Sequence, residues 1–420
     1  MPSKAIGRID WRHLSVADKV ALLAIGIFMI LPNYSKQQAS RRLSGYYMAF
    51  FAVYGIAIPL WPRWLEAQVS IEYVGIVLGV SYWLKLIVVP LVSWVADAVG
   101  DRRRVMIMLA IVVVAALGLL PWLDGWVLYA IVWGVAGAAL STGIPLSDGL
   151  SIRLGHMLGV EFGKVRRWGS VSFIIMALGV GALADRYGLD AVYVAIVVTS
   201  VLLVIAAYSV PRIHTPPQSD KVPVFKPLAL PNFPLFLITV SLLLSTHAAL
   251  YGFSAIYWKT AGYSNMVITL LWVAAVVAEI AMFSVSGRLI DRYGAMPMIV
   301  VAALGGVVRW VLLGTSTDLP ILILGQSLHA FTFALLYMSL IAYMSKRVPA
   351  AISASAQGLY DSLSMGVFFG VLTMAAGYLY EIKPAYSFYL MAGCSALGFV
   401  LAVVLLRRVR AYEKAEPPLL

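Results

Sequence analysis

The sequence predicts an all-α, polytopic membrane protein with twelve transmembrane helices in two six-helix halves. Composition is the first reason, because 62% of the 420 residues are hydrophobic and only 12% are charged. Soluble domains average about 45–50% apolar and about 25% charged residues. The second reason is that apolar segments of about 20 residues, the length that crosses a bilayer as a helix, recur along the chain. Most of the chain therefore has lipid as its solvent.

The apolar segments fall into two sets of six that flank a polar linker. In the first half we expect spans near 44–65, 70–96, 105–123, 126–150, 163–184 and 189–210. In the second half we expect spans near 232–258, 264–286, 295–315, 319–343, 352–379 and 385–406. Segment 211–231 is rich in proline and basic residues, so it is the expected linker between bundles 41–210 and 232–406. Residues 407–420 form the expected tail.

Residues 1–40 precede the first predicted span. Their apolar run VALLAIGIFMIL is twelve residues long, which is short for a crossing, and no small-residue cleavage site of a signal peptide follows it. We expect a cytoplasmic or interfacial N-terminal extension, either an interfacial helix or an over-long start to the reading frame, and not a thirteenth span.

Basic residues gather on one side of this predicted topology. That side holds Arg41, Arg42, Arg102, Arg103, Arg104, Arg153, Lys164, Arg212, Lys221, Lys226, Arg288, Arg292, Lys346, Arg347, Arg407, Arg408 and Arg410, whereas the opposite loops hold Arg63, Arg186, Lys259 and Lys383. The positive-inside rule then places both termini in the cytoplasm, and we expect a multi-pass protein of a bacterial inner membrane. The net charge of +12 follows from this topology, and no continuous basic patch indicates nucleic acid. The single Cys394 excludes a disulfide framework and a Cys-based metal cluster.

Two similar blocks, WVADAVGDRRR (94–104) and GRLIDRYG (287–294), occupy equivalent tight turns in the two halves. They resemble the G-x-x-x-D-R-x-G-R loop signature of the major facilitator superfamily, which implies that superfamily's fold. A similar block, GALADRYG (181–188), follows the fifth span on the opposite side, so the motif is loose. Solvated turns in which Arg caps a helix end are the alternative interpretation. The candidate gating-loop residues are Asp97, Gly100, Arg102, Gly287, Asp291, Arg292 and Gly294.

Eight ionisable residues lie inside predicted spans, where a charge is costly and indicates a function or a buried partner. They are Lys85, Asp148, Arg166, His247, Glu279, Arg309, His329 and Asp361. In antiparallel helices, residues equidistant from the connecting turn lie at the same depth, because each residue rises about 1.5 Å. The last five are equidistant in consecutive pairs from residues 263, 294, 319 and 345. They are therefore expected in one mid-membrane layer.

The first half contributes polar groups as well. Asp148 and Arg166 are equidistant from residue 157, and Lys85 lies near the middle of its span. For any single residue, a structural ion pair such as Glu279 with Arg309 explains the charge as well as a function does. Unrelated ion pairs do not require a common depth, so the layer as a whole favours a functional pathway between the halves.

Two segments resemble the lactose permease group of the superfamily. FGKVRRWGSVSF resembles its G-R-x-R-x-F-G element, with Asp148 eighteen residues before Arg166, which implies that both contact substrate. Arg309 and His329 match that group's Arg and His on helices nine and ten, and Glu279 lies near its helix-eight Glu, which implies proton coupling. The group's H-x-x-E is here His329-Ala-Phe-Thr332, so the proton carrier must be another group. Glu279, Asp361 and His329 are the candidates.

The chain also resembles the 3-phenylpropionic acid permease branch, in HAALYGFSAIYWKTAGYS, WVAAVVAE, GGVVRW and PLSD, over about residues 41–405. This resemblance implies proton-driven uptake of an aromatic carboxylate, without a soluble cofactor. We hypothesise that Arg166 holds the carboxylate, with Lys85 or Arg309 as second cation. His247 and Tyr251 share one helix face with hydrogen-bonding and stacking groups, so Tyr251 and Trp83 are expected to hold the ring.

Coupling is expected from a helix shift that makes or breaks a contact between Glu279 and Arg309, with His329 as a relay. A sugar or nucleoside proton symporter of the same fold, with Asp148 and Arg166 binding hydroxyls, is an open alternative. An exporter is another. A membrane-embedded enzyme or receptor is disfavoured, because the sequence has no nucleotide loop, metal-ligand spacing or catalytic triad pattern. We therefore expect a transporter, not an enzyme, whose partners are a small molecule, protons and lipid, and which acts as a monomer.

Overall fold

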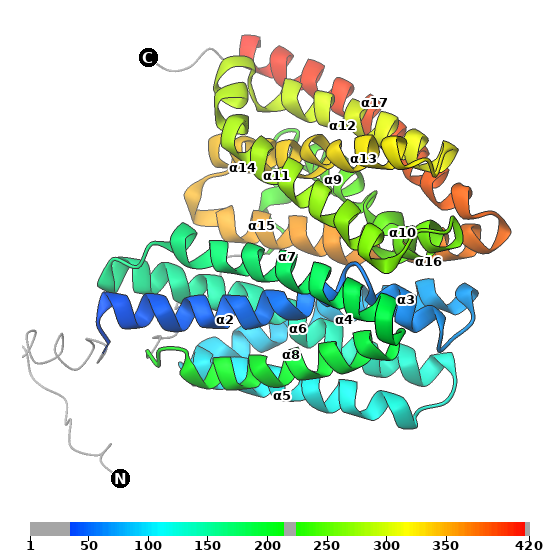
Figure 1. Cartoon of the computed structure of the whole chain (residues 1–420). Coiled ribbons are helices and arrows are strands. Elements are labelled where there is room, and N and C mark those ends of the chain that lie inside the picture. The colour runs from blue at the N-terminus through cyan, green and yellow to red at the C-terminus, as the bar shows by residue number, and fades with distance from the viewer. Residues whose placement is uncertain (1–33, 214–223, 416–420) are drawn as a thin grey trace, which may run out of the picture.

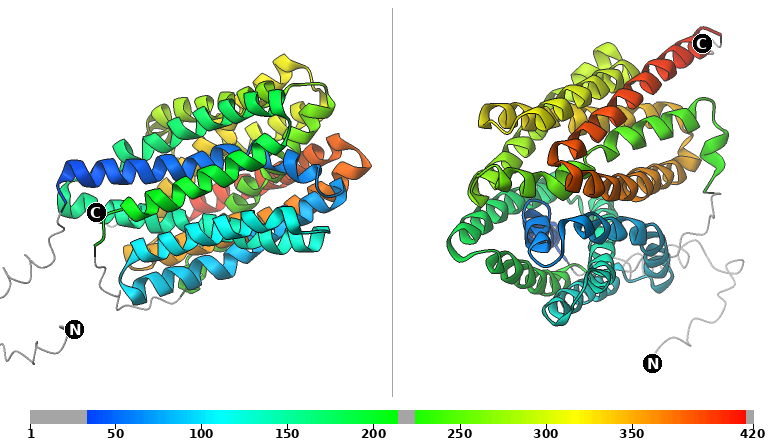
Figure 2. Two further views of the ribbon diagram at one scale, coloured as in Figure 1. Left: turned by 60° about the horizontal axis from the view of Figure 1, so that its bottom comes forward. Right: turned by 90° about the vertical axis from the view of Figure 1, so that its right-hand side faces the viewer.

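The computed structural model describes residues 34–213 and 224–415. All regular secondary structure within these residues is helical. Eleven helical stretches in this part of the chain are long and apolar enough to cross a membrane. The first half contains α2 (Lys36–Ala57), α3 (Trp61–Glu66), α4 (Ile71–Val99), α5 (Arg102–Leu119), α6 (Trp126–Leu158), α7 (Phe162–Tyr187) and α8 (Asp190–Ser209). Figures 1 and 2 show these helices as one bundle, packed against a second bundle.

The second bundle contains several spans that are built from two or three pieces. Its helices are α9 (Phe233–Ser245), α10 (Ala248–Thr260), α11 (Asn265–Tyr293), α12 (Ala295–Thr315), α13 (Leu319–Ser327), η3 (Ala330–Leu335), α14 (Leu336–Arg347), α15 (Ser353–Asp361), η5 (Ser362–Phe368), α16 (Phe369–Ile382) and α17 (Pro384–Ala415). Of these, α9 with α10, α13 with η3 and α14, and α15 with η5 and α16 each form one span. The pseudo-repeated, all-α fold predicted from the sequence is confirmed.

Helix α2 adds a twelfth span to these eleven and is the first in the described part of the chain. It lies along the other helices of its half (Figure 1). It begins at Lys36 because Ser35 and Gln38 form a capping box, in which each side chain binds the other's backbone N–H. Residues 36–40, expected in the extension, therefore belong to this helix, whereas residues 1–33 lie outside the described part. The helix also ends at Ala57, not near residue 65, because Pro59 and Pro62 interrupt the pattern of backbone hydrogen bonds.

Several helices run further than predicted, as α6 does in ending at Leu158 and not near residue 150, and two of them correct the gating-loop assignment. Helix α4 continues to Val99 and α11 to Tyr293, so Asp97, Gly287, Asp291 and Arg292 are helical and not in loops. Each of these two helices ends where a glycine takes a positive φ, 67° at Gly100 and 89° at Gly294, which a residue without Cβ adopts at little cost. Helix α17 likewise continues through residues 407–415 of the expected tail.

Mid-span irregularities occur where the second half carries its polar residues. The turns η3 and η5 are π-helical, and they directly follow His329 and Asp361. The break between α9 and α10 falls at Thr246 and His247. Such π-helical turns frequently occur at functional sites, because they turn a side chain out of the regular helical register.

The two halves meet mainly at one end of the molecule. We call the end at which α2 begins and α17 ends the terminal end, and the opposite end the distal end (Figure 1). The halves are joined by α4 with η5 and α16, by α7 with α11, and by α10 with α3 and α4. At Gly75 a Cβ would lie 2.8 Å from the Thr373 carbonyl oxygen, so the backbones of α4 and α16 are in direct contact. Helices α9, α14 and α15, at the terminal end, make no comparable contact with the first half. The distal end is closed in this conformation.

Candidate functional site

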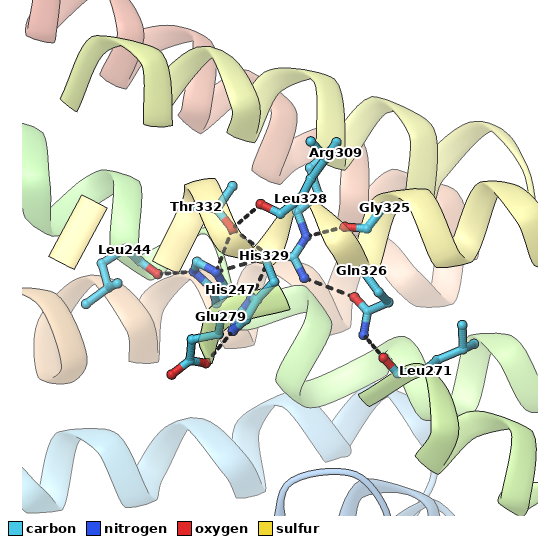
Figure 3. Close-up of polar contacts among 10 residues, drawn as sticks. All are labelled: Leu244, His247, Leu271, Glu279, Arg309, Gly325, Gln326, Leu328, His329 and Thr332. Atoms are coloured by element: carbon cyan, nitrogen blue, oxygen red, sulfur yellow. Dashed lines mark hydrogen bonds and ion pairs between the residues drawn. The ribbon is translucent and has the colours of Figure 1, made fainter. Parts of the chain in front are cut away.

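Arg309 of α12 is the centre of a buried polar network in the second half (Figure 3). Its Nε donates to the Gly325 carbonyl oxygen at 2.9 Å, and its Nη2 donates to Gln326 Oε1 at 3.0 Å. Nη1 donates to Thr332 Oγ1 at 2.7 Å. Both α13 and the π-helical turn η3 therefore supply neutral acceptors for a guanidinium that is 0% exposed.

Two histidines complete this network, and the hydrogen bonds define their protonation. Nη1 of Arg309 lies 3.2 Å from His247 Nε2 and 2.9 Å from His329 Nδ1. A guanidinium only donates, so both ring nitrogens accept, and each imidazole carries its proton on the other nitrogen. His247 Nδ1 then donates to the Leu244 carbonyl oxygen at 2.8 Å. His329 Nε2 points at Glu279 Oε2 at 3.4 Å, which gives a chain from Arg309 through His329 to Glu279 (Figure 3).

Glu279 and Arg309, whose contact is expected to form and break during coupling, do not touch in this conformation. Arg309 points towards α13 and η3, while Glu279 reaches only His329, which lies between them. Thr332, which replaces the Glu of the H-x-x-E element, accepts a hydrogen bond from Arg309 through its hydroxyl. Four of the five residues expected at one depth are thus joined in a single network.

Asp361, the fifth residue, lies apart from this network and pairs with Lys85 of α4. The Nζ of Lys85 is 3.3 Å from Oδ2 and 3.4 Å from Oδ1 of Asp361. The Lys85 side chain is 14% exposed and that of Asp361 is 47% exposed. This ion pair links the two halves, so Lys85, expected as a second cation for substrate, already has a carboxylate partner in this conformation.

Asp148 and Arg166 face each other across the first half without forming an ion pair within 4.0 Å. Tyr47 of α2 donates to Asp148 Oδ1 at 2.6 Å and lies 3.1 Å from Ser151 Oγ. The guanidinium of Arg166 stacks on Phe51, 3.8 Å from the ring centroid, and lies 5.6 Å from that of Tyr47. Arg166 interacts electrostatically with Asp148 and, across the interface between the halves, with Glu279. The helices that carry Arg166 and Glu279, α7 and α11, pack against each other across the interface.

A cavity of about 100 Å³ lies between the halves. Its lining is aromatic and hydroxylic, and includes Tyr54, Tyr82, Trp133, Ser141, Tyr251 and Thr373. Tyr251, expected to hold the aromatic ring, comes from α10, which begins directly after His247. Trp83 does not line the cavity: its indole packs against Gly370 and it is 42% exposed, and the preceding Tyr82 takes its place.

Sequence reasoning missed several members of the site. Tyr47, Tyr54 and Tyr82 were not singled out, because packing aromatics and site aromatics look alike in the sequence. Gln326 carried a usable signal, because it is a polar residue in an apolar run and lies three residues, about one helical turn, before His329. Thr332 was noted only as the replacement of a Glu.

Comparisons with known proteins show the family to which this chain belongs. The model of the "MFS_1 like family" matches residues 40–391. A probable 3-phenylpropionic acid transporter of Escherichia coli (strain K12) is 32% identical over 367 residues, which cover 84% of this chain and 95% of the relative. The chain belongs to this family. It is therefore a membrane transporter of the major facilitator type.

Other relatives of this major facilitator transporter differ in their named substrates. A maltose permease of Geobacillus stearothermophilus is 26% identical and covers 87% of this chain and 94% of its own length. The crystal structure of nucleoside transporter NupG matches with a TM-score of 0.74 at 17% identity, over 88% of this chain and 99% of that one. A D-xylose-proton symporter matches with a TM-score of 0.65 at 16% identity, over 86% and 96%. These structures show the shared fold alone.

In the described part of this transporter, no cluster of three or more His, Cys, Asp or Glu side chains could hold a metal ion.

Among the gating candidates, the guanidinium of Arg102 packs against α6, where a Cβ at Gly149 would lie 2.2 Å from its Nη1. Arg292 lies over the ring of Tyr293, 5.1 Å from its centroid. The side chain of Asp97 lies outside the described residues.

Proposed function

We propose that this transporter is a proton-coupled symporter of a small organic carboxylate that carries an aromatic ring. The observation that supports this proposal is the chain from Arg309 through His329 to Glu279, whose carboxylate interacts with Arg166 of the other half. A titratable carboxyl group next to a substrate-facing guanidinium combines the two requirements of carboxylate symport, a proton site and an anion site. The relative named as a probable 3-phenylpropionic acid transporter supports the substrate class.

Coupling would arise from competition for Arg166. A substrate carboxylate bound at Arg166 brings a second negative charge close to Glu279. Two carboxylates beside one guanidinium repel each other, and a proton on Glu279 removes that repulsion. Binding of the substrate and binding of the proton then favour each other, as symport requires. His329 connects Glu279 to Arg309 and would relay the change in charge to the buried network.

The aromatic ring would occupy the cavity lined by Tyr54, Tyr82 and Tyr251. Stacking and edge contacts with such rings contribute about 0.5–1.5 kcal/mol each beyond burial. The Lys85–Asp361 pair lies where α4 meets the start of η5, so its ions would part when the halves rock during alternating access. If the termini are cytoplasmic, as the positive-inside rule predicts, the closed distal end faces outwards and this conformation faces the cytoplasm.

A sugar or nucleoside substrate is the second candidate, and one observation favours it. Tyr47, Asp148 and Ser151 form a group of hydroxyls around a carboxylate, which suits the recognition of substrate hydroxyls. The maltose permease relative belongs to this class by name. In that case Arg166 would hold Asp148 in place and would not bind a substrate anion.

Uptake into proteoliposomes distinguishes the two candidates. We expect labelled 3-phenylpropionate to accumulate under an inward proton gradient, to be released by protonophore, and to be displaced by unlabelled benzoate-type acids but not by maltose or uridine. Arg166→Gln should abolish uptake, whereas Arg167→Gln, one residue along on the exposed face, should retain it. Displacement by maltose or uridine instead would support the second candidate. If labelled 3-phenylpropionate did not accumulate under an inward proton gradient but was exported under an outward one, the proposed direction of transport would be contradicted.

A further inference from the structure

The first turn of α11 has an unusual source of hydrogen-bond acceptors. Ser264 caps only the third backbone N–H of the helix, that of Val267, at 3.2 Å. The first two N–H groups are capped from the other half of the protein: Asp185 of α7 accepts from Asn265 N at 2.7 Å and from Met266 N at 2.9 Å. Asp185 also accepts from the Asn265 side-chain amide at 3.0 Å. The helix start is therefore complete only while the two halves are in contact.

Close packing one turn away positions this carboxylate. At Gly181, four residues before Asp185 on α7, a Cβ would lie 2.6 Å from Thr269 Oγ1 and 3.2 Å from the Asn265 carbonyl oxygen. A residue with a side chain would push α7 and α11 apart, so Gly181 allows the approach that Asp185 needs. Both residues belong to GALADRYG, the block that sequence reasoning set aside as evidence of a loose motif.

We propose that Asp185 is a distal latch, a positioning residue that holds the distal end of the transporter closed. A carboxylate at a helix N-terminus is stabilised by the partial positive charge of the helix and by charge-assisted hydrogen bonds. When the halves separate at this end, water must replace the carboxylate as acceptor, so the distal-open state loses the interaction. The latch thus sets the equilibrium between distal-closed and distal-open states. It rests on the fold and not on the proposed substrate.

Distances between spin labels at the distal end test whether Asp185 holds that end closed. Labels on cysteines placed at positions 124 and 318, in the two halves, report the separation in lipid nanodiscs, with Cys394→Ser removing the native thiol. Loss of a helix cap shifts an equilibrium by about a few-fold to thirtyfold. We expect Asp185→Ala to raise the ratio of long to short distances by on the order of tenfold. Asp185→Asn, which keeps one acceptor oxygen, should give an intermediate ratio.

The matched control is Asp190→Ala, which removes an exposed carboxylate at the same end without altering a contact between the halves. It should leave the ratio unchanged. The latch is contradicted if Asp185→Ala stays within about twofold of the wild type, less than a cap contributes, or if Asp190→Ala shifts the ratio equally. Should Asp185→Ala fail to fold, the same comparison is made with Asp185→Asn, for which an unchanged ratio also overturns the proposal.

Discussion

A buried guanidinium without a carboxylate in hydrogen-bond contact defines the chemistry of this transporter at the residue scale. Arg309 is 0% exposed and donates to a carbonyl, an amide, a hydroxyl and two imidazoles. The sequence predicted that Arg309, His329 and Glu279 share a depth, because the rise of a helix is fixed. It did not predict which of them touch, because the direction of the His329 side chain depends on the π-helical turn that follows it. No residue pattern in the sequence indicated that turn.

Thr332→Val tests the network itself. The substitution keeps the shape of the side chain but removes the hydroxyl that accepts from Arg309 Nη1 at 2.7 Å. Nη1 keeps both imidazoles as acceptors, but the loss of one hydrogen bond to a charged group costs about 1.5–3 kcal/mol, so we expect a lower apparent melting temperature in detergent. Thr239→Val is the control, because its hydroxyl bonds only the Leu235 carbonyl of its own helix. Equal destabilisation by both variants would mean that Thr332 has no special part in holding Arg309.

At the scale of elements, small residues determine which helices can touch. Hydropathy predicted most spans to within a few residues, because the bilayer requires about 20 apolar residues for each. It misplaced the end of the first span, where the prolines after Ala57 break the helix. It also misplaced the ends of α4, α6 and α11, each of which continues to a glycine with positive φ. Contacts between helices were not predictable, because lipid-facing and helix-facing apolar residues look alike in sequence.

Gly75→Val tests the contact between α4 and α16. A Cβ at this position would lie 2.8 Å from the Thr373 carbonyl oxygen and 3.1 Å from Gly377 Cα, so the two helices must move apart. We expect the distal-open population to increase, measured with the same pair of spin labels. Gly118→Val is the control, because a Cβ there meets nothing within 4 Å. If Gly118→Val opened the distal end as much, the packing of α4 on α16 would not be what keeps it closed.

At the scale of the whole molecule, the two halves hold different parts of one proposed site. The first half supplies Arg166 and Asp148, and the second supplies Glu279 with the histidine network. The pseudo-repeat was readable from the sequence, because it follows from hydropathy, whereas residues 214–223 of the expected linker lie outside the described part. The closed distal end was not, because a transporter has one sequence and at least two packings that differ by a few kcal/mol.

The proposed coupling between the halves depends on a proton at Glu279, so Glu279→Gln is the variant to measure. The amide keeps the size and hydrogen-bonding capacity of the carboxyl group but cannot take up and release a proton. Two transport modes are compared in proteoliposomes with labelled 3-phenylpropionate: uphill accumulation driven by an inward proton gradient, and counterflow exchange without a gradient. Glu381→Gln, an exposed change near the end of α16, is the control and should leave both modes intact.

We expect Glu279→Gln to reduce gradient-driven accumulation by more than about tenfold, the ratio that 1.4 kcal/mol of lost coupling would give, and to retain counterflow. That result would place the coupled proton at Glu279. Full accumulation in Glu279→Gln, with the same dependence on the proton gradient as the wild type, would contradict this role of Glu279. The coupled proton would then have to bind another group.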